Sequence, residues 1–93
     1  MLTLDTIKKK ILSVCETTTW LDKLFIDSVD DHQIAFSLVG NAKSGLQFGG
    51  LQYDLQKKLP LVVNISMRIP SAETVQQYYS KGLVAYDKQN LAS

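Results

Sequence analysis

The chain holds little of the chemistry that usually marks a functional site. Its 93 residues include one cysteine (Cys15), one histidine (His32) and two prolines. A single cysteine excludes an internal disulfide and favours a reducing compartment. Every apolar run is far shorter than the roughly 20 residues that cross a bilayer, and the first residues lack the charged start of a signal peptide. We therefore expect a cytoplasmic protein.

Charge of one sign is also scarce. Ten basic and nine acidic residues leave a formal net charge of +1. The only basic cluster is Lys8–Lys10. Because each helical residue turns about 100°, these side chains would fan out over a solvated face rather than form a phosphate clamp. We expect neither a nucleic acid nor a membrane as partner.

The size and composition predict one ordinary globular domain. Hydrophobic residues make up 45% of the chain and charged residues 20%, which is typical of globular proteins. A chain of this length has room for one core. We predict a single domain over residues 1–86 and a flexible tail over residues 87–93.

The N-terminal half predicts a helix and a hairpin. Thr3 is suited to cap the helix, because its hydroxyl can accept a free backbone N–H, and threonines 17–19 are expected to end it. Leu21–Val29 and Gln33–Val39 predict two strands that are joined by a polar turn at residues 30–32. One apolar stripe recurs along the helix at spacings of three and four residues: Leu4, Ile7, Ile11, Val14 and Cys15.

A second helix is predicted to run up to Leu59. Gly49 and Gly50 lie in its first half, where each glycine costs roughly 1 kcal/mol relative to alanine. The cost leaves two interpretations open. The helix begins near Gly50, or the glycines allow a neighbour to approach closely.

The C-terminal third predicts a strand and a further helix. Leu61–Ile69 alternates between apolar and polar side chains, as a half-buried strand does. Ser71 is suited to cap the next helix and Gly82 to end it. Leu83–Tyr86 predicts only a short extended segment.

These elements predict an α+β fold with the order αββαβα. It is a small two-layer sandwich in which the helices cover one face of a three-stranded mixed sheet. A right-handed crossover would place Leu61–Ile69 parallel to one strand of the hairpin.

The loop between the hairpin and the second helix is the candidate contact site. Loops of this kind present side chains without disturbing a core. The loop lysine supplies a positive charge, and the start of the following helix supplies free N–H groups, so an acidic group on a partner or an anion is the expected target. The alternative is a loop that only allows the helix to pack. The candidate residues are Asn41, Lys43, Ser44 and Gly45.

No residue pattern predicts catalysis or a metal site. His32 has no partner at a useful spacing and reads as a turn residue. Cys15 lies on the apolar stripe of a helix, which is typical of a buried, inert thiol. Glycines 45–50 match neither a phosphate-binding loop nor a dinucleotide fingerprint. We expect no catalytic residue, no metal ligand and no enzyme activity.

Two blocks of sequence carry a family resemblance. They are Ile34–Leu38 followed by Ala42–Ser44, and Asn64–Ile69 with Val75-Gln76 shortly after. They resemble the second strand, loop and third strand of the N-terminal accessory domain in Mrp-type iron–sulfur cluster carrier P-loop ATPases, a module like the iron–sulfur cluster assembly domains. The resemblance covers roughly Leu4 to Gln77.

The resemblance implies a non-catalytic accessory domain of an iron–sulfur carrier or assembly protein that acts through protein contacts. The expected partner is a carrier ATPase domain or an iron–sulfur client or assembly protein. ATP and the cluster would belong to a carrier domain, because this chain has no Gly-Lys-Gly-Gly or Cys-x-x-Cys sequence and its loop from Gly40 to Gly49 has no cysteine. We therefore expect no cofactor in this chain.

The alternative hypothesis is a KH-like nucleic-acid-binding module, because that fold shares the order helix, hairpin, helix, strand. A KH loop needs two residues between its glycines, whereas three separate Gly45 from Gly49. The near-neutral charge also argues against it.

Overall fold

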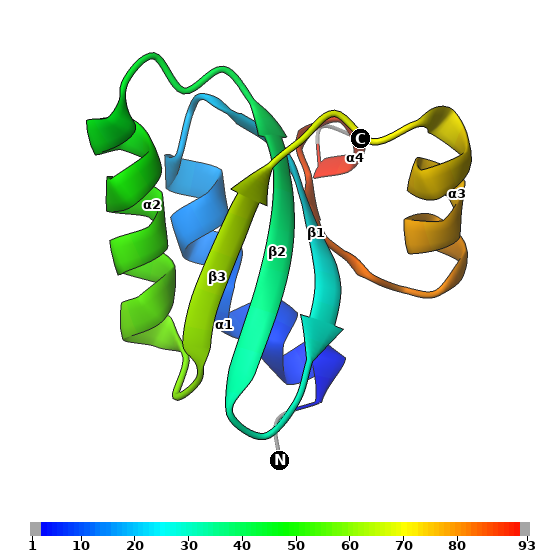
Figure 1. Cartoon of the computed structure of the whole chain (residues 1–93), viewed down its shortest axis with the longest axis horizontal. Helices are drawn as coiled ribbons and strands as arrows, with labels where there is room; N and C mark the ends of the chain where they lie inside the picture. The colour runs from blue at the N-terminus through cyan, green and yellow to red at the C-terminus, as the bar shows by residue number, and fades with distance from the viewer. Residues whose placement is uncertain (1–2, 92–93) are drawn as a thin grey trace.

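The computed structural model describes residues 3–91 (Figure 1). Four helices and four strands make up the described chain. In order they are α1 (Leu4–Thr17), β1 (Leu21–Val29), β2 (Gln33–Gly40), α2 (Gly45–Lys58), β3 (Val62–Met67), α3 (Ala72–Ser80), β4 (Val84–Asp87) and α4 (Lys88–Leu91).

The strands form one mixed sheet in the order β3-β2-β1-β4. β1 pairs antiparallel with β2 and with β4, and β2 pairs parallel with β3. The predicted α+β class and the parallel crossover are therefore confirmed. The predicted number of three strands is wrong, because β4 adds a fourth at the edge of β1. A strand of four residues is too short to show an alternating pattern, and its pairing with β1 is a backbone interaction that side-chain types do not reveal.

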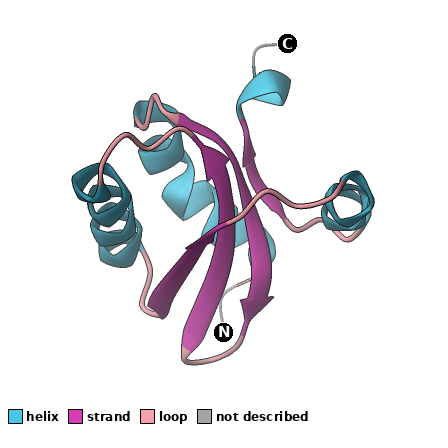
Figure 2. Cartoon of the chain, turned by 45° about the horizontal axis from the view of Figure 1, so that its top comes forward, coloured by secondary structure: helices cyan, strands magenta, loops and turns pink. Residues whose placement is uncertain are grey.

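The sequence predicted that all helices cover one face of the sheet, and this prediction is wrong. α1 and α2 lie on one face, whereas α3 lies on the other side, beside β1 (Figures 1 and 2). The reason is Phe25 of β1, which is fully buried but points away from the core under α1 and α2. Its ring stacks on Tyr78 of α3, with ring centroids 4.4 Å apart.

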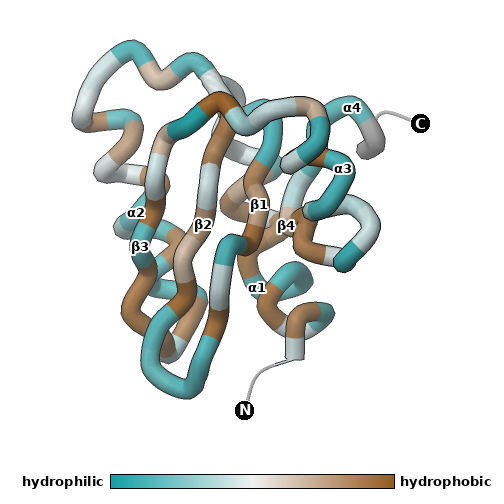
Figure 3. Tube along the Cα trace, turned by 45° about the vertical axis from the view of Figure 1, so that its right-hand side comes forward, coloured by the Kyte–Doolittle hydropathy of each residue, from teal (hydrophilic) through white to brown (hydrophobic). Residues whose placement is uncertain are grey.

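The core lies between the sheet and the pair α1 and α2. It is built from the stripe of α1 and from the inward side chains of the strands, and Figure 3 shows the hydrophobic strands beside a hydrophilic hairpin tip. Its fully buried side chains include Ile7, Ile11, Leu21, Leu24, Ile26, Ile34, Phe36, Leu38, Leu55 and Val63.

Four of the predicted helix ends are confirmed. The Thr3 hydroxyl accepts the backbone N–H of Thr6 at 3.1 Å, and α1 ends at Thr17. Ser71 caps α3, and Gly82 follows it with a φ of 70°. A positive φ costs glycine nothing, which explains why a glycine occupies this position.

The predicted start of α2 near Gly50 is wrong. The helix begins at Gly45, because Ser44 caps it and Leu51 and Leu55 bury its inner face against the core. These interactions offset the weak helix propensity of the two glycines, as tertiary packing often does.

The chain continues with regular structure beyond Tyr86. The sequence predicted a flexible tail over residues 87–93, but Asp87 belongs to β4 and Lys88–Leu91 forms α4. Residues 92 and 93 lie outside the described part of the chain.

Candidate functional site

The candidate loop lies at the end of the molecule where β2 and β3 finish. Because these two strands are parallel, the loop after β2 and the segment after β3 leave the sheet at the same end (Figure 1). Lys43 is exposed in the first segment. In the second, the side chains of Met67 and Ile69 are 49% and 93% exposed, on either side of the exposed Arg68. We call the surface formed by Lys43, Met67, Arg68 and Ile69 the crossover end.

A reciprocal cap organises the loop beside Lys43. The Ser44 hydroxyl accepts the backbone N–H of Gln47 at 3.4 Å, and the Gln47 side-chain oxygen accepts the backbone N–H of Lys43 at 2.6 Å. Two N–H groups that could have held an anion are thus used within the chain. The structure therefore places Asn41, Lys43, Ser44 and Gly45 in one loop, with Lys43 as its exposed charged side chain.

A polar cluster under α3 was missed by the sequence analysis. Asp27 of β1 accepts hydrogen bonds from the hydroxyl of Tyr78 and, at 2.5 Å, from the hydroxyl of Ser37. Ser37 faces Phe25 across the hairpin and is buried. The available signal was a polar residue at an apolar run in each strand: Asp27 follows Leu24–Ile26, and Ser37 lies between Phe36 and Leu38. The contact attaches α3 to the second face of the sheet.

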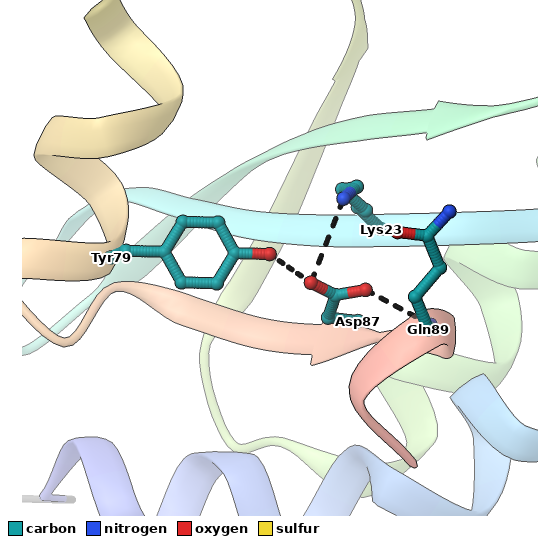
Figure 4. A network of polar contacts seen from close by, with 4 residues as sticks. All are labelled: Lys23, Tyr79, Asp87 and Gln89. Atoms are coloured by element: carbon teal, nitrogen blue, oxygen red, sulfur yellow. Dashed lines mark hydrogen bonds and ion pairs between the residues drawn. The ribbon is translucent and has the colours of Figure 1, made fainter. Parts of the chain in front are cut away.

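The second tyrosine of α3 makes a matching contact on β4. The hydroxyl of Tyr79 donates to the carboxylate of Asp87, which also accepts the backbone N–H of Gln89 at 3.0 Å (Figure 4). Lys23 of β1 lies 3.6 Å from the same carboxylate. Burial and this hydrogen bond raise the pKa of Tyr79 to about 12. One buried carboxylate therefore connects β1, α3, β4 and the start of α4.

A hollow of about 210 Å³ lies beside α3. It combines one carboxylate with one lysine ammonium, so its lining favours no single ligand charge. The residues around it are Asp27, Thr74, Gln77, Tyr78, Lys81 and Leu83.

His32 and Cys15 occupy structural positions. The backbone N–H groups of His32 and Gln33 donate to the Asp30 carboxylate at 2.7 and 2.9 Å, which closes the hairpin turn and lowers the pKa of Asp30. The Cys15 thiol is fully buried in the core, and burial raises its pKa to about 12. A thiol that stays protonated at neutral pH is a poor nucleophile.

Within residues 3–91, no group of three or more histidine, cysteine, aspartate or glutamate side chains could hold a metal ion. In the same part of the chain, no helix is both long and apolar enough to span a membrane. Comparisons with known proteins found no matching family model, no matching curated protein and no matching solved structure.

The buried thiol predicts a loss of stability at alkaline pH. The pKa of Cys15 rises from the ordinary 9.0 in the unfolded chain to about 12 in the folded one, so the folded state holds its proton more tightly. Between pH 9 and 12, unfolding should therefore release this proton, and the free energy of unfolding should fall by up to about 1.4 kcal/mol per pH unit. Urea titrations at a series of pH values measure this slope.

The matched variant for this prediction is Cys15→Ala. It should be less stable at pH 7 but should show a shallower slope just above pH 9. An identical slope in both proteins would show that another group causes the alkaline effect.

Proposed function

We propose that this chain is a non-catalytic interaction domain that binds a protein partner at the crossover end. The observation that carries the proposal is the exposure of Ile69 and Met67 next to Arg68. Two large apolar side chains at one exposed segment are unfavourable in water and become favourable when a partner covers them.

The charges at the crossover end support a partner that is acidic. Lys43 and Arg68 are the charged side chains of the segments 41–47 and 67–71, and neither segment holds an acidic residue. Complementary charges guide association and select among partners. The partner segment we propose therefore combines apolar side chains with aspartate or glutamate.

We further propose that the partner is an iron–sulfur carrier ATPase domain or another iron–sulfur assembly protein in the cytoplasm. The support is the resemblance in Ile34–Leu38, Ala42–Ser44 and Asn64–Ile69. These blocks belong to β2, β3 and the segments that follow them, so they include all four residues of the crossover end. In this proposal, ATP hydrolysis and cluster ligation belong to the partner.

Charge reversal at the crossover end tests the binding surface. We expect Lys43→Glu with Arg68→Glu to weaken binding of a purified Mrp-type carrier ATPase domain about tenfold or more, mainly through slower association. The melting temperature should change little, because exposed substitutions usually shift stability by about 0.5 kcal/mol or less. Isothermal titration calorimetry and thermal unfolding measure the two effects.

The matched control reverses two exposed lysines of α1, Lys9→Glu with Lys10→Glu. It makes the same change in net charge and should leave the affinity nearly as it was. If both double variants weaken binding equally, the effect comes from net charge alone, which would contradict a specific binding site. If Lys43→Ala alone lowers the melting temperature sharply while binding survives, the loop has a structural role and does not form the binding site.

Cluster reconstitution tests the division of labour with the partner. We expect the isolated chain, incubated anaerobically with iron and sulfide, to form no stable cluster, because its one cysteine is buried and iron–sulfur clusters are held by several cysteine thiolates. Visible absorption after desalting is the readout. A stoichiometric charge-transfer band that survives desalting would assign the cluster to this chain.

A further inference from the structure

The outward face of α2 is unusual for an exposed helix. Leu46, Gly50, Tyr53 and Lys57 follow one another at spacings of four, three and four residues, which places them on one stripe opposite the buried Leu51 and Leu55. A surface helix normally carries polar side chains on such a stripe. Here the Leu46 side chain is 88% exposed and the Tyr53 side chain 63%.

The glycines on this side of α2 have no explanation within the chain. Neither Gly49 nor Gly50 has the positive φ that would require glycine. A Cβ atom added at either position would meet no atom within 4 Å. Each glycine nevertheless weakens the helix by roughly 1 kcal/mol relative to alanine. The backbone is therefore open to close approach from outside the chain.

We propose that a second copy of this chain docks on the outward face of α2, with the two α2 helices antiparallel around a two-fold axis between Gly49 and Gly50. This interface goes beyond the partner surface proposed above and does not depend on it. A two-fold interface requires a patch that is complementary to itself. Leu46 lies three residues before Gly49 and Tyr53 lies three residues after Gly50, so the axis brings Leu46 of each copy onto Tyr53 of the other.

The glycine pair at the axis determines how closely the helices approach. Interaxial distances of about 8–10 Å depend on the side chains at the contact, and glycine permits the short end of this range. Within the chain, the Tyr53 ring contacts the Lys57 ammonium, which lies 4.8 Å from the centre of the ring.

The charges on α2 select an antiparallel second copy. Asp54 lies four residues after Gly50 and Gly45 four residues before Gly49, so the same axis places Asp54 beside the N-terminus of α2 in the other copy. A carboxylate is favoured there by the helix dipole, and Lys43 next to that N-terminus adds an opposite charge. With a net charge of +1 per chain, repulsion between two copies is small.

Sedimentation equilibrium of the full chain tests this interface. We expect a reversible monomer–dimer equilibrium with a dissociation constant below about 1 mM. Gly50→Gln places a side chain on the axis and should raise the dissociation constant about tenfold or more. The same variant should melt no lower than the natural chain at high dilution, because glutamine favours the helix. The control Ser13→Gln adds the same side chain to an exposed position of α1 and should leave dimerisation unchanged.

Leu46→Gln is the second variant. Because the Leu46 side chain is exposed, this change should leave the fold intact, so it tests the interface even if Gly50→Gln disturbs the helix. It should weaken the dimer as well. A natural chain that stays monomeric up to about 1 mM overturns the proposal. A dimer that survives both α2 variants also overturns it, because the contact then lies elsewhere. Neither result decides binding of the carrier domain: because Lys43 borders both surfaces, Arg68→Glu alone, after β3 and away from the α2 contact, tests the crossover end separately.

Discussion

Replacing Phe36 by alanine is expected to remove about 3–5 kcal/mol of stability. Phe36 lies in β2, between β1 and β3, and its ring is completely buried in the core under α1 and α2. The substitution loses the transfer free energy of the ring and leaves a cavity that central strands cannot close. A domain of this size has a total stability of about 5–14 kcal/mol, so the variant should be much closer to unfolding.

Urea unfolding followed by circular dichroism measures this loss. The control Tyr53→Ala also removes an aromatic ring, but from an exposed side chain of α2. Measured at dilution, where the proposed dimer dissociates, it should cost far less. Similar losses for both variants would mean that Phe36 does not lie in a tightly packed core.

Replacing Gly40 by alanine is expected to destabilise the fold by about 1–3 kcal/mol. An added Cβ atom would lie 2.5 Å from the Trp20 carbonyl oxygen, which is far inside contact distance. That oxygen accepts the backbone N–H of Asn41 at 3.0 Å, so it cannot move away without losing this hydrogen bond. Thermal unfolding at low protein concentration is the measurement.

At the two glycines of α2, replacement by alanine is expected to have the opposite effect on stability. Gly49→Ala and Gly50→Ala should each raise the stability of the dilute chain by up to about 1 kcal/mol, because the added Cβ atoms meet open space and alanine favours the helix. Gly40→Ala should therefore lower the melting temperature while the two α2 variants raise it. The same sign at all three positions would contradict the packing described for Gly40.

The attachment of α3 shows where sequence reasoning reached its limit. Tyr78 and Tyr79 are neighbours on one helix, and adjacent helical residues point in different directions, so the sequence does not reveal which partner each hydroxyl finds. In the structure each hydroxyl reaches a different carboxylate, Asp27 or Asp87. Asp27 lies 51 residues from Tyr78 in the sequence, and Asp87 reaches Tyr79 only because β4 turns back to pair with β1, so the folded sheet brings the partners together.

Local chemistry along the sequence determined most of the elements and their caps. Thr3 and Ser71 cap helices, and Gly82 ends one, because hydroxyl acceptors and a positive φ act within a few residues. The period-two pattern predicted β2 and the strand-favouring residues Phe25, Ile26 and Val29 predicted β1, and the helical crossover predicted that β3 runs parallel to one strand of the hairpin, which is β2. The position of the candidate loop after β2 followed from the same patterns.

Only the tertiary structure decided the fourth strand, the side of the sheet that α3 covers and the outward face of α2. β4 forms because the edge of β1 offers backbone partners, which four residues of sequence do not reveal. α3 lies on the second face because Phe25 needs a cover there. Glycines 49 and 50 allowed two interpretations until the structure showed open space beside them. For β4 and α3 the deciding interaction joins residues far apart in the chain, where local sequence patterns carry no information.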